Sequence, residues 1–413
     1  MDKENKNINW TRRDFLKNGL KAAGYVSAGV LCGKLCMYVS GKKQLPDNYD
    51  ELKEAWYYEK LSNNKVKCLL CVCDCIIEEG QTGFCKARIN LKGGLYSLVY
   101  GAISCDSFFL NVAHSLIFSS SEETWSVIGT AGCNMRCKFC LNWTMSQADP
   151  AEVEIVPFIL NEDPMDEKQK KIHKGKKMLV SPEQLVSATI QRGNSIIGYN
   201  YNEPTVYYEY MFETAKLAKN KGLINLIATN GYMHEKPLLD LLPYMDAVSI
   251  GIKGFDDEIY RNYCGARLDP VLKTLRILKR ENILFEITYV LIPAVNDDME
   301  QIKKMCVWIR DNLGPEIPLH FYRFSPNYLM PNLPQTPISL LEKAQKIAWQ
   351  SGIKYVYIYF LGKYLDSTIE EKIYCPNCNK LLLHRKDMRG LLENNTVRGK
   401  CKFCGEKILF YVK

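Results

Sequence analysis

The chain has 413 residues, of which 47% are hydrophobic, 54 are basic and 46 are acidic, with a net charge of +8. This composition predicts a folded protein of about two or three domains and excludes an extensively disordered chain. The basic residues form no long block, so we expect no nucleic-acid partner. Most of the 17 cysteines fall into tight clusters in a large chain. That pattern is typical of metal binding and not of a disulfide-rich secreted domain.

Residues 1–45 are predicted to be a leader. The segment Thr11–Lys17 contains paired arginines and matches a twin-arginine export signal, and an apolar stretch, Ala22–Gly33, follows it. This stretch is too short to span a bilayer. No clear cleavage site is present, and an uncleaved leader that only touches the membrane is the alternative.

Residues 46–120 are predicted to form a cysteine module after a polar linker at 46–54. Gly80 and Gly83 supply turns that can return the last cysteine of the module to the first three. Four thiolates can hold zinc or a second iron–sulfur cluster, and reduced cysteines without metal are the third alternative. Cys73 makes the ligand set ambiguous. The predicted ligands are Cys68, Cys71, Cys75 and Cys85.

The predicted core, residues 121–365, opens with a buried strand at 125–130 and a turn at Gly132. Three cysteines follow directly: Cys133, Cys137 and Cys140. An electron-transfer [4Fe–4S] cluster normally takes four cysteines, so three leave one iron free for a substrate. A zinc site lacking one ligand and three buried structural cysteines are the alternatives. Neither explains why the triplet follows a strand, where ligand sites lie in parallel α/β folds.

Beyond the triplet, short apolar runs alternate with amphipathic stretches. The predicted strands are 195–198, 224–228, 247–250, 285–290, 319–322 and 355–359, and the predicted helices are 182–192, 205–221, 269–281, 298–312 and 339–351. This alternation predicts an α/β fold with a parallel sheet. About six such units predict a partial (β/α)6 TIM-like barrel with its chemistry at the carboxyl ends of the strands. Residues 162–177 are rich in charge and are predicted to be an exposed insertion.

Residues 366–413 contain two further Cys-x-x-Cys pairs. Cys375 and Cys378 are separated by 22 residues from Cys401 and Cys404. This pattern predicts a zinc ribbon, and the metal would be structural because so short a segment rarely folds without one. A single iron, bound as in rubredoxin, is the alternative.

Polar residues at or near the ends of predicted strands are candidate ligand-binding residues. Each has a structural alternative: a helix start at Pro204, a turn at Asn230-Gly231, a surface position for Lys253 and a core position for His320. The sequence assigns no catalytic residue. The candidates are Asn202, Glu203, Thr229, Asn230, Lys253 and His320.

Together these segments resemble the AmmeMemoRadiSam-system enzymes, a radical S-adenosylmethionine (radical SAM) subfamily related to the pyruvate formate-lyase activating enzymes. The resemblance covers nearly everything from Tyr57 to Ile408. It rests on the four-cysteine module and on the segments WYYEKL, GLYSLVYG, GCNMRCKFCLNW, YNYNEPTVYYEY, ATNGY, KGFDDEIYRNYCG, PLHFYRFSP, CPNC and CKFCGEKI.

The resemblance implies that the cysteine triplet holds a [4Fe–4S] cluster whose free iron binds SAM. Reductive cleavage then gives methionine and a 5′-deoxyadenosyl radical that abstracts hydrogen. It further implies that the Asn202-Glu203 motif accepts from the SAM amino group. A low-potential donor of the flavodoxin or ferredoxin type would supply the electron. The substrate is open, and a protein, in particular a glycyl-radical protein, is one candidate.

Three departures from the family pattern stand out. Gly251 replaces an Asp that helps hold a cation beside SAM, Val72 and Cys73 replace a Pro-His pair, and Leu141 replaces a Gln. Together with the leader, the lost Asp motivates an alternative: an exported iron–sulfur or zinc protein that transfers electrons or scaffolds a partner without cleaving SAM. The leader favours export or membrane association, whereas SAM chemistry favours the cytoplasm, so the sequence leaves the compartment open.

Overall fold

The computed structural model describes residues 52–110, 124–150, 179–360, 370–386, 390–397 and 399–408. The predicted leader and the predicted insertion at 162–177 lie outside these ranges. Within them, no helix is long and apolar enough to cross a membrane.

An eight-stranded sheet forms the centre of the fold, in the order β13-β12-β11-β10-β9-β8-β7-β6. Its seven strands from β7 to β13 are parallel, and β6 joins β7 antiparallel. This confirms the predicted α/β fold with a parallel sheet. The bounds are β6 Cys105–Leu110, β7 Thr124–Gly129, β8 Ile196–Tyr199, β9 Ile224–Thr229, β10 Ala247–Ile252, β11 Leu284–Leu291, β12 Leu319–Arg323 and β13 Val356–Phe360.

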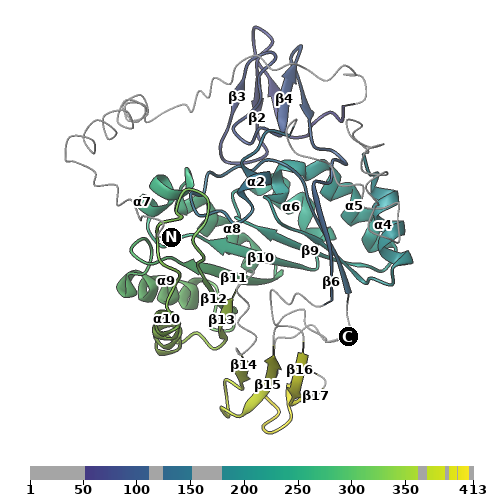
Figure 1. Cartoon of the computed structure of the whole chain (residues 1–413). Helices are drawn as coiled ribbons and strands as arrows, with labels where there is room; N and C mark the ends of the chain where they lie inside the picture. The colour runs from purple at the N-terminus through teal and green to yellow at the C-terminus, as the bar shows by residue number, and fades with distance from the viewer. Residues whose placement is uncertain are drawn as a thin grey trace, which may run out of the picture. The chain divides into compact units, whose positions relative to one another are not determined.

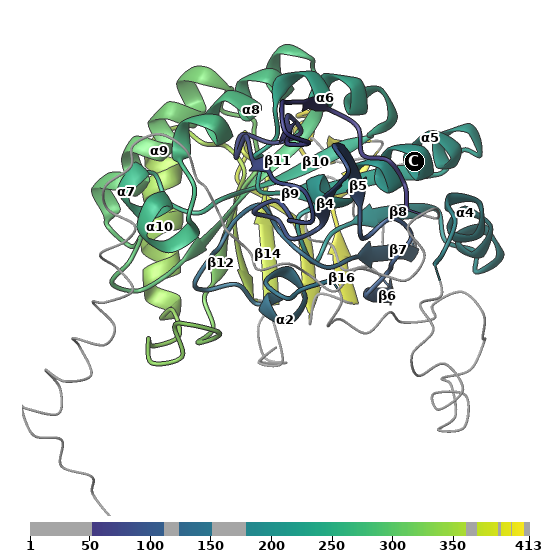
Figure 2. The same ribbon diagram turned by 90° about the horizontal axis from the view of Figure 1, so that it is seen from above.

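The helices that connect the parallel strands lie together on one side of the sheet (Figures 1 and 2). This follows from the strand order, because successive right-handed crossovers in one direction place every helix on the same face. α4 begins with a capping box between Ser181 and Gln184. The connecting helices are α4 Pro182–Gln191, α5 Tyr208–Asn220, α6 Glu235–Leu241, α8 Leu268–Arg280, α9 Met299–Asn312 and α10 Ile338–Gln350.

Several short helical segments lie in the loops that follow the strands. They are α2 Trp143–Ser146, the 3-10 turns Pro204–Tyr207 and Leu242–Tyr244, α7 Asp257–Ile259, and a π-helical turn at Tyr260–Cys264. The sequence predicts one helix over 205–221, and the structure divides that range into a 3-10 turn and α5. The break leaves Glu203 as the residue that caps the first turn.

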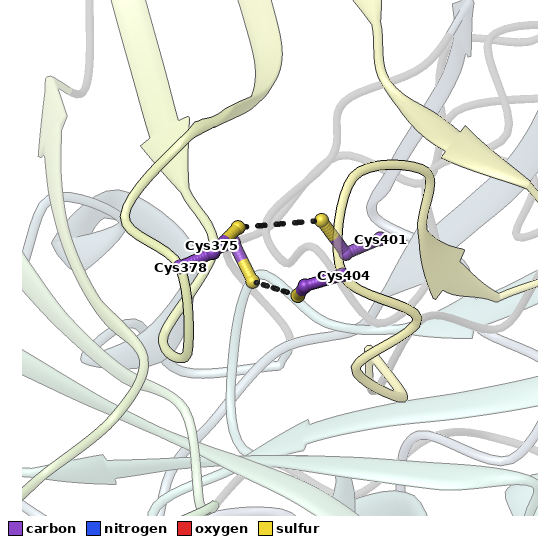
Figure 3. Close-up of side chains that lie close together, drawn as sticks. All are labelled: Cys375, Cys378, Cys401 and Cys404. Atoms are coloured by element: carbon purple, nitrogen blue, oxygen red, sulfur yellow. Dashed lines mark hydrogen bonds between the residues drawn. The ribbon is translucent and has the colours of Figure 1, made fainter.

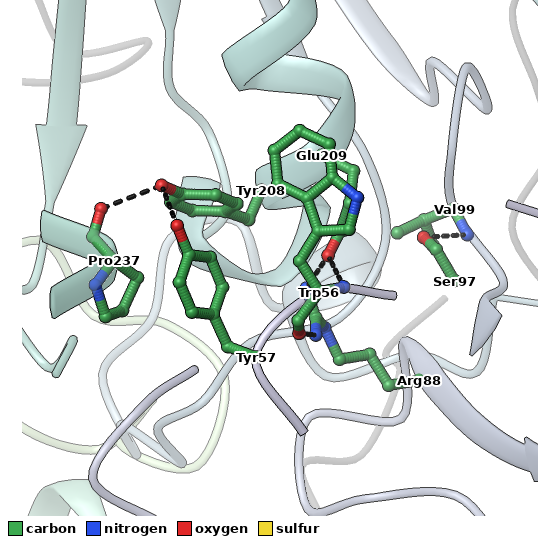
Figure 4. Close-up of polar contacts among 8 residues, drawn as sticks. All are labelled: Trp56, Tyr57, Arg88, Ser97, Val99, Tyr208, Glu209 and Pro237. Atoms are coloured by element: carbon green, nitrogen blue, oxygen red, sulfur yellow. Dashed lines mark hydrogen bonds and ion pairs between the residues drawn. The ribbon is translucent and has the colours of Figure 1, made fainter. Parts of the chain in front are cut away.

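The amino-terminal cysteine module is built from two small antiparallel sheets. One contains β1 Tyr58–Lys60, β2 Val66–Cys68 and β3 Ile76–Ile77, and the other contains β4 Arg88–Leu91 and β5 Gly94–Ser97. Figure 4 shows the contacts that bind the module to the core, where Tyr57 and Arg88 reach Tyr208 and Glu209 of α5. The Tyr208 hydroxyl in turn donates to the Pro237 carbonyl in α6 at 2.8 Å.

The carboxyl-terminal cysteine module contains a three-stranded antiparallel sheet and a two-stranded hairpin. Its buried side chains include Leu382 and Leu383, which pack with Tyr355 and Tyr357 near the last strand of the core. The strands are β14 Glu370–Tyr374, β15 Leu381–Lys386, β16 Gly390–Asn394, β17 Thr396–Val397 and β18 Lys400–Cys401.

Candidate active site

The loop that carries Cys133, Cys137 and Cys140 begins at the carboxyl end of β7. Gly132 opens this loop with a φ of 91°, in the left-handed region. A Cβ at Gly132 would lie 2.5 Å from the carbonyl oxygen of Cys85. The close approach therefore requires glycine, and it places the amino-terminal module directly against the start of the loop.

The three thiols of this loop are partly buried and contact polar groups. The Met135 amide donates to the Cys133 Sγ at 3.4 Å, and the Ser146 Oγ lies 3.1 Å from the Cys140 Sγ. Burial, reinforced by the Glu203 carboxylate, raises the pKa of the Cys133 thiol well above its usual value. Such thiols do not ionise readily by themselves, and metal coordination is what makes a buried thiolate stable. Hydrogen bonds to the sulfurs also tune the potential of a bound cluster.

Cys264 is a buried thiol beside this loop, and sequence reasoning missed it. A hydrogen bond between the Cys264 and Cys137 thiols, together with burial, raises the pKa of Cys137 well above its usual value. The Arg136 amide donates to the Cys264 carbonyl at 2.7 Å. Cys264 lies in the segment KGFDDEIYRNYCG, which the resemblance already includes. It is 127 positions from Cys137, however, and no spacing rule links the two cysteines.

Asn202 ties the loop after β8 to the beginning of the cysteine loop. Its side-chain oxygen accepts from the Thr130 amide at 3.0 Å, and its Nδ2 donates to the Gly132 carbonyl at 2.9 Å. Tyr201, just before it, has a φ of 67°, and its carbonyl accepts from Asn142 at 2.7 Å. Asn202 thus fixes the two ends of strands β7 and β8 relative to each other.

Glu203 connects the loops after β8 and β9. Its Oε1 accepts from the Thr205 hydroxyl at 2.6 Å and the Thr229 hydroxyl at 2.7 Å, and its Oε2 accepts from the Asn230 amide at 2.7 Å. Burial raises the pKa of Glu203, and these hydrogen bonds offset part of the rise. Three of the candidates, Glu203, Thr229 and Asn230, are therefore brought together by direct contact.

Asn230 continues this network to the cysteine loop. Its Nδ2 donates to the Asn134 side-chain oxygen at 2.8 Å, and the Asn134 Nδ2 donates to the Tyr232 carbonyl at 3.1 Å. Asn134 is 1% exposed and lies between Cys133 and Met135. Sequence reasoning missed Asn134, although its position inside the cysteine motif was a usable signal.

Lys253 follows β10, and its ammonium folds back over Gly251. A Cβ added to Gly251 would lie 2.5 Å from the Lys253 Nζ. The Lys253 charge also acts on the Cys137 and Cys140 thiols, because it lowers their pKa values against the larger, raising effect of their surroundings. The absence of a side chain at Gly251 thus leaves room for the Lys253 ammonium.

His320 occupies a different part of the sheet from the other five candidates. It is the second residue of β12, three residues or about 10 Å before the strand's carboxyl end at Arg323. Its Nε2 lies 3.1 Å from Glu286 Oε2, and both side chains are 1% exposed. This position is typical of a core residue.

The two accessory cysteine sets differ in geometry. Within the described ranges, only the carboxyl-terminal set places three or more metal-ligating atoms within 4.8 Å of one another. Its sulfurs pair at 3.6 Å for Cys375 and Cys404 and at 3.7 Å for Cys378 and Cys401 (Figure 3). A tetrahedral zinc with Zn–S bonds of about 2.3 Å requires sulfurs about 3.8 Å apart. This set therefore fits a single metal ion.

Comparison with known proteins agrees with this geometry. The model of the radical SAM superfamily matches residues 127–306. The uncharacterized protein MJ0808 of Methanocaldococcus jannaschii is 39% identical over 86% of this chain and 99% of its own length. The (2S)-3-sulfopropanediol dehydratase activating enzyme of Klebsiella oxytoca is 30% identical over 31% of this chain. The pyruvate formate-lyase 1-activating enzyme of Escherichia coli is 26% identical over 44% of it.

The matches to these two activating enzymes span 40% and 66% of their lengths. Among solved structures, a domain of pyruvate-formate lyase-activating enzyme from Bacteroides vulgatus aligns with a TM-score of 0.35 and 16% identity, covering 40% of this chain and 98% of that domain. Residues 127–306 form a domain of the radical SAM superfamily, and the chain is a radical SAM enzyme. It is a homologue of activating enzymes of the pyruvate formate-lyase type and a full-length relative of MJ0808.

Proposed function

We propose that this enzyme cleaves SAM reductively and abstracts hydrogen from a protein substrate. One observation carries the proposal: three partly buried thiols lie at the carboxyl edge of the sheet, next to the Asn202-Glu203 loop and within reach of the Lys253 charge. The donor set fits a cluster with one open iron, because thiolates are the ligands that iron–sulfur clusters take. When bound and reduced, that cluster supplies the electron that splits SAM into methionine and a 5′-deoxyadenosyl radical.

Different residues of the chain would hold the cluster and SAM. Cys133, Cys137 and Cys140 would hold the cluster. The Lys253 ammonium would pair with the SAM carboxylate, which carries the opposite charge. Glu203 already accepts from Thr205, Thr229 and Asn230, so its carboxylate positions the surrounding loops, and its carbonyl accepts from the Val206 amide at 3.1 Å.

Exposed apolar side chains near the cysteine loop support a macromolecular substrate. Leu141 is 45% exposed, Trp143 is 39% exposed and Leu329 is 60% exposed. Trp143 stacks on Tyr328 with ring centroids 5.0 Å apart. The Leu329 amide donates to the Lys138 carbonyl at 3.1 Å, which attaches this group to the loop. Large exposed apolar groups of this kind are typical of protein interaction sites.

The names of the related activating enzymes point to the same class of substrate, since each is described as activating another enzyme. We therefore extend the proposal to a glycyl-radical protein as the substrate and a one-electron donor of low potential as the reductant. A docked protein would also cover Trp143 and Leu329 and exclude water from the radical step.

The test is anaerobic reconstitution of the enzyme with iron and sulfide, followed by dithionite and SAM, with 5′-deoxyadenosine measured against a Cys140→Ala variant. Product that depends on Cys140 is the expected result. An intact, reducible cluster that forms no 5′-deoxyadenosine would overturn the proposal and favour an electron-transfer or scaffold protein. Addition of candidate glycyl-radical proteins, followed by electron paramagnetic resonance for a protein radical, then tests the substrate.

A further inference from the structure

Five cysteines of the amino-terminal module surround a cavity beside the active site. Asn134 lines this cavity together with Cys68, Cys71, Cys73, Cys75 and Cys85. Cys68 is buried and the other four are partly buried. Five thiols thus line one cavity in a module whose strands are only two to four residues long.

The spacing of these sulfurs does not fit one metal ion. Within the part of the chain that the structure describes, no three of the five come within 4.8 Å of one another, whereas the carboxyl-terminal cysteines do. A single tetrahedral zinc needs every pair of sulfurs at about 3.8 Å. An iron–sulfur cluster places its ligands on different irons around a larger inorganic core, so its cysteines stand farther apart and enclose a space.

The cavity lies directly beside the loop that carries Cys133, Cys137 and Cys140. Asn134 lines the cavity and follows Cys133 in the chain, and its carbonyl accepts from the Cys73 thiol at 3.5 Å. Arg136 donates to the Phe84 carbonyl and lies over the Phe84 ring at 4.1 Å. Lys86 Nζ donates to the Gln147 carbonyl at 2.9 Å. These contacts hold the two cysteine sets rigidly next to each other.

We propose that Cys68, Cys71, Cys75 and Cys85 bind a second iron–sulfur cluster of more than one iron, and that it passes single electrons to the cluster on Cys133, Cys137 and Cys140. An external one-electron reductant of low potential reduces the second cluster, and the same electron then moves to the first, so that each transfer oxidises one centre and reduces the next. The relay rests on the proposed function. The presence of the second cluster does not.

Metal analysis of a triple variant tests the cluster without disturbing the module. The chain with Cys133→Ala, Cys137→Ala and Cys140→Ala, purified anaerobically, is expected to retain about two to four irons with matching sulfide and one zinc. Loss of the iron, or iron replaced by a second zinc, would overturn the proposal. A Cys306→Ala chain is the matched control, because Cys306 is a buried thiol in α9 away from both sets, and it should keep the iron of both clusters.

Spectroscopy of the converse variant tests the relay. The chain with Cys68→Ala and Cys75→Ala should keep about four irons and a SAM-sensitive electron paramagnetic resonance signal after dithionite. Its SAM-cluster reduction by a flavodoxin-type protein should slow at least tenfold, while reduction by the small molecule dithionite stays within about twofold. Unchanged reduction by the protein donor would overturn the relay and leave radical SAM chemistry itself intact. If this chain does not fold, the triple variant still decides whether the second cluster exists.

Discussion

Arg88 Nη2 lies 2.5 Å from Glu209 Oε1, and both side chains are almost completely buried, at 2% and 1% exposure. This ion pair joins β4 of the amino-terminal module to α5 of the core (Figure 4). Trp56 completes the arrangement: its amide donates to Glu209 at 2.7 Å, and its carbonyl accepts from Arg88 at 3.0 Å. The amino-terminal cysteine module is therefore fixed to the core by charges that water does not reach.

Replacing Glu209 with Gln is expected to destabilise the protein by about 3–5 kcal/mol, because it leaves the Arg88 charge buried without its counter-charge. Replacing both residues, with Arg88→Met and Glu209→Leu, should cost less than the sum of the two single changes. The free energy of unfolding checks this, measured by urea titration of the parent, Glu209→Gln, Arg88→Met, Glu209→Leu and the double variant. A loss below about 1 kcal/mol for Glu209→Gln would contradict it.

Gly132→Ala is expected to prevent proper closure of the cysteine loop. The new Cβ would meet the Cys85 carbonyl oxygen at 2.5 Å, and the residue has a φ of 91°. Gly193→Ala is a matched control, since Gly193 also has a positive φ of 72° but nothing lies within 4 Å of its Cβ position.

The control should lose only the backbone cost of about 1–2 kcal/mol. Gly132→Ala should lose more than this in urea titrations and also bind less iron after reconstitution. Equal losses of stability and full iron content in both variants would show that the contact with Cys85 is unimportant.

Sequence periodicity was sufficient for most of the sheet and its helices. The range 182–192 corresponds to α4 at Pro182–Gln191, and 269–281 to α8 at Leu268–Arg280, because their apolar residues recur at the helical period. Helix α6, with only seven residues and Pro237 inside it, gave no such signal. β6 was also missed. Its sequence CDSFFL lies within the range assigned to the cysteine module, but the strand pairs antiparallel with β7 of the core.

The site shows the same division between local and distant information. Gly251 and Lys253 are two positions apart at the end of a strand, so they share a face, and their relationship could be read from the chain. By contrast, Asn134 meets Asn230 across 96 positions, and Arg88 meets Glu209 across 121. Contacts of that range depend on the strand order, which a single sequence does not specify.

Glu203 should make stability depend on pH. Burial raises its pKa in the folded state, with hydrogen bonds from Asn230, Thr205 and Thr229 acting in the opposite direction. The unfolded chain therefore releases this proton at lower pH than the folded one does. The folded state binds more protons in between, so this contribution to stability falls as the pH rises above about 4.3.

The Glu203→Gln variant lacks this titration. The free energy of unfolding of this variant and of the parent is measured at several pH values between about 5 and 8, at equal metal loading. The difference between the two should shrink as the pH rises. A parent whose advantage grows with pH would contradict the expected sign and indicate a Glu203 stabilised as the carboxylate.

The ammonium of Lys253 should determine how tightly SAM binds. Lys253→Met removes the charge proposed to pair with the SAM carboxylate, and a hydrogen bond to a charged group contributes about 1.5–3 kcal/mol, so the Kd for SAM should rise roughly 10–100-fold. Gly251→Ala keeps the charge but displaces it, because its Cβ would lie 2.5 Å from the Nζ. The flexible lysine can move, so the free energy of unfolding should change by less than about 0.5 kcal/mol.

We therefore expect the Kd of Gly251→Ala for SAM to lie between that of the parent and that of Lys253→Met. The fold should be unaffected. Isothermal titration of the reconstituted, unreduced enzyme measures each Kd. Lys303→Met, on the exposed surface of α9, is the control for removal of a positive charge and should bind SAM like the parent. An unchanged Kd in Lys253→Met would show that the SAM carboxylate is held elsewhere, and the position of Gly251 would then have no bearing on the substrate.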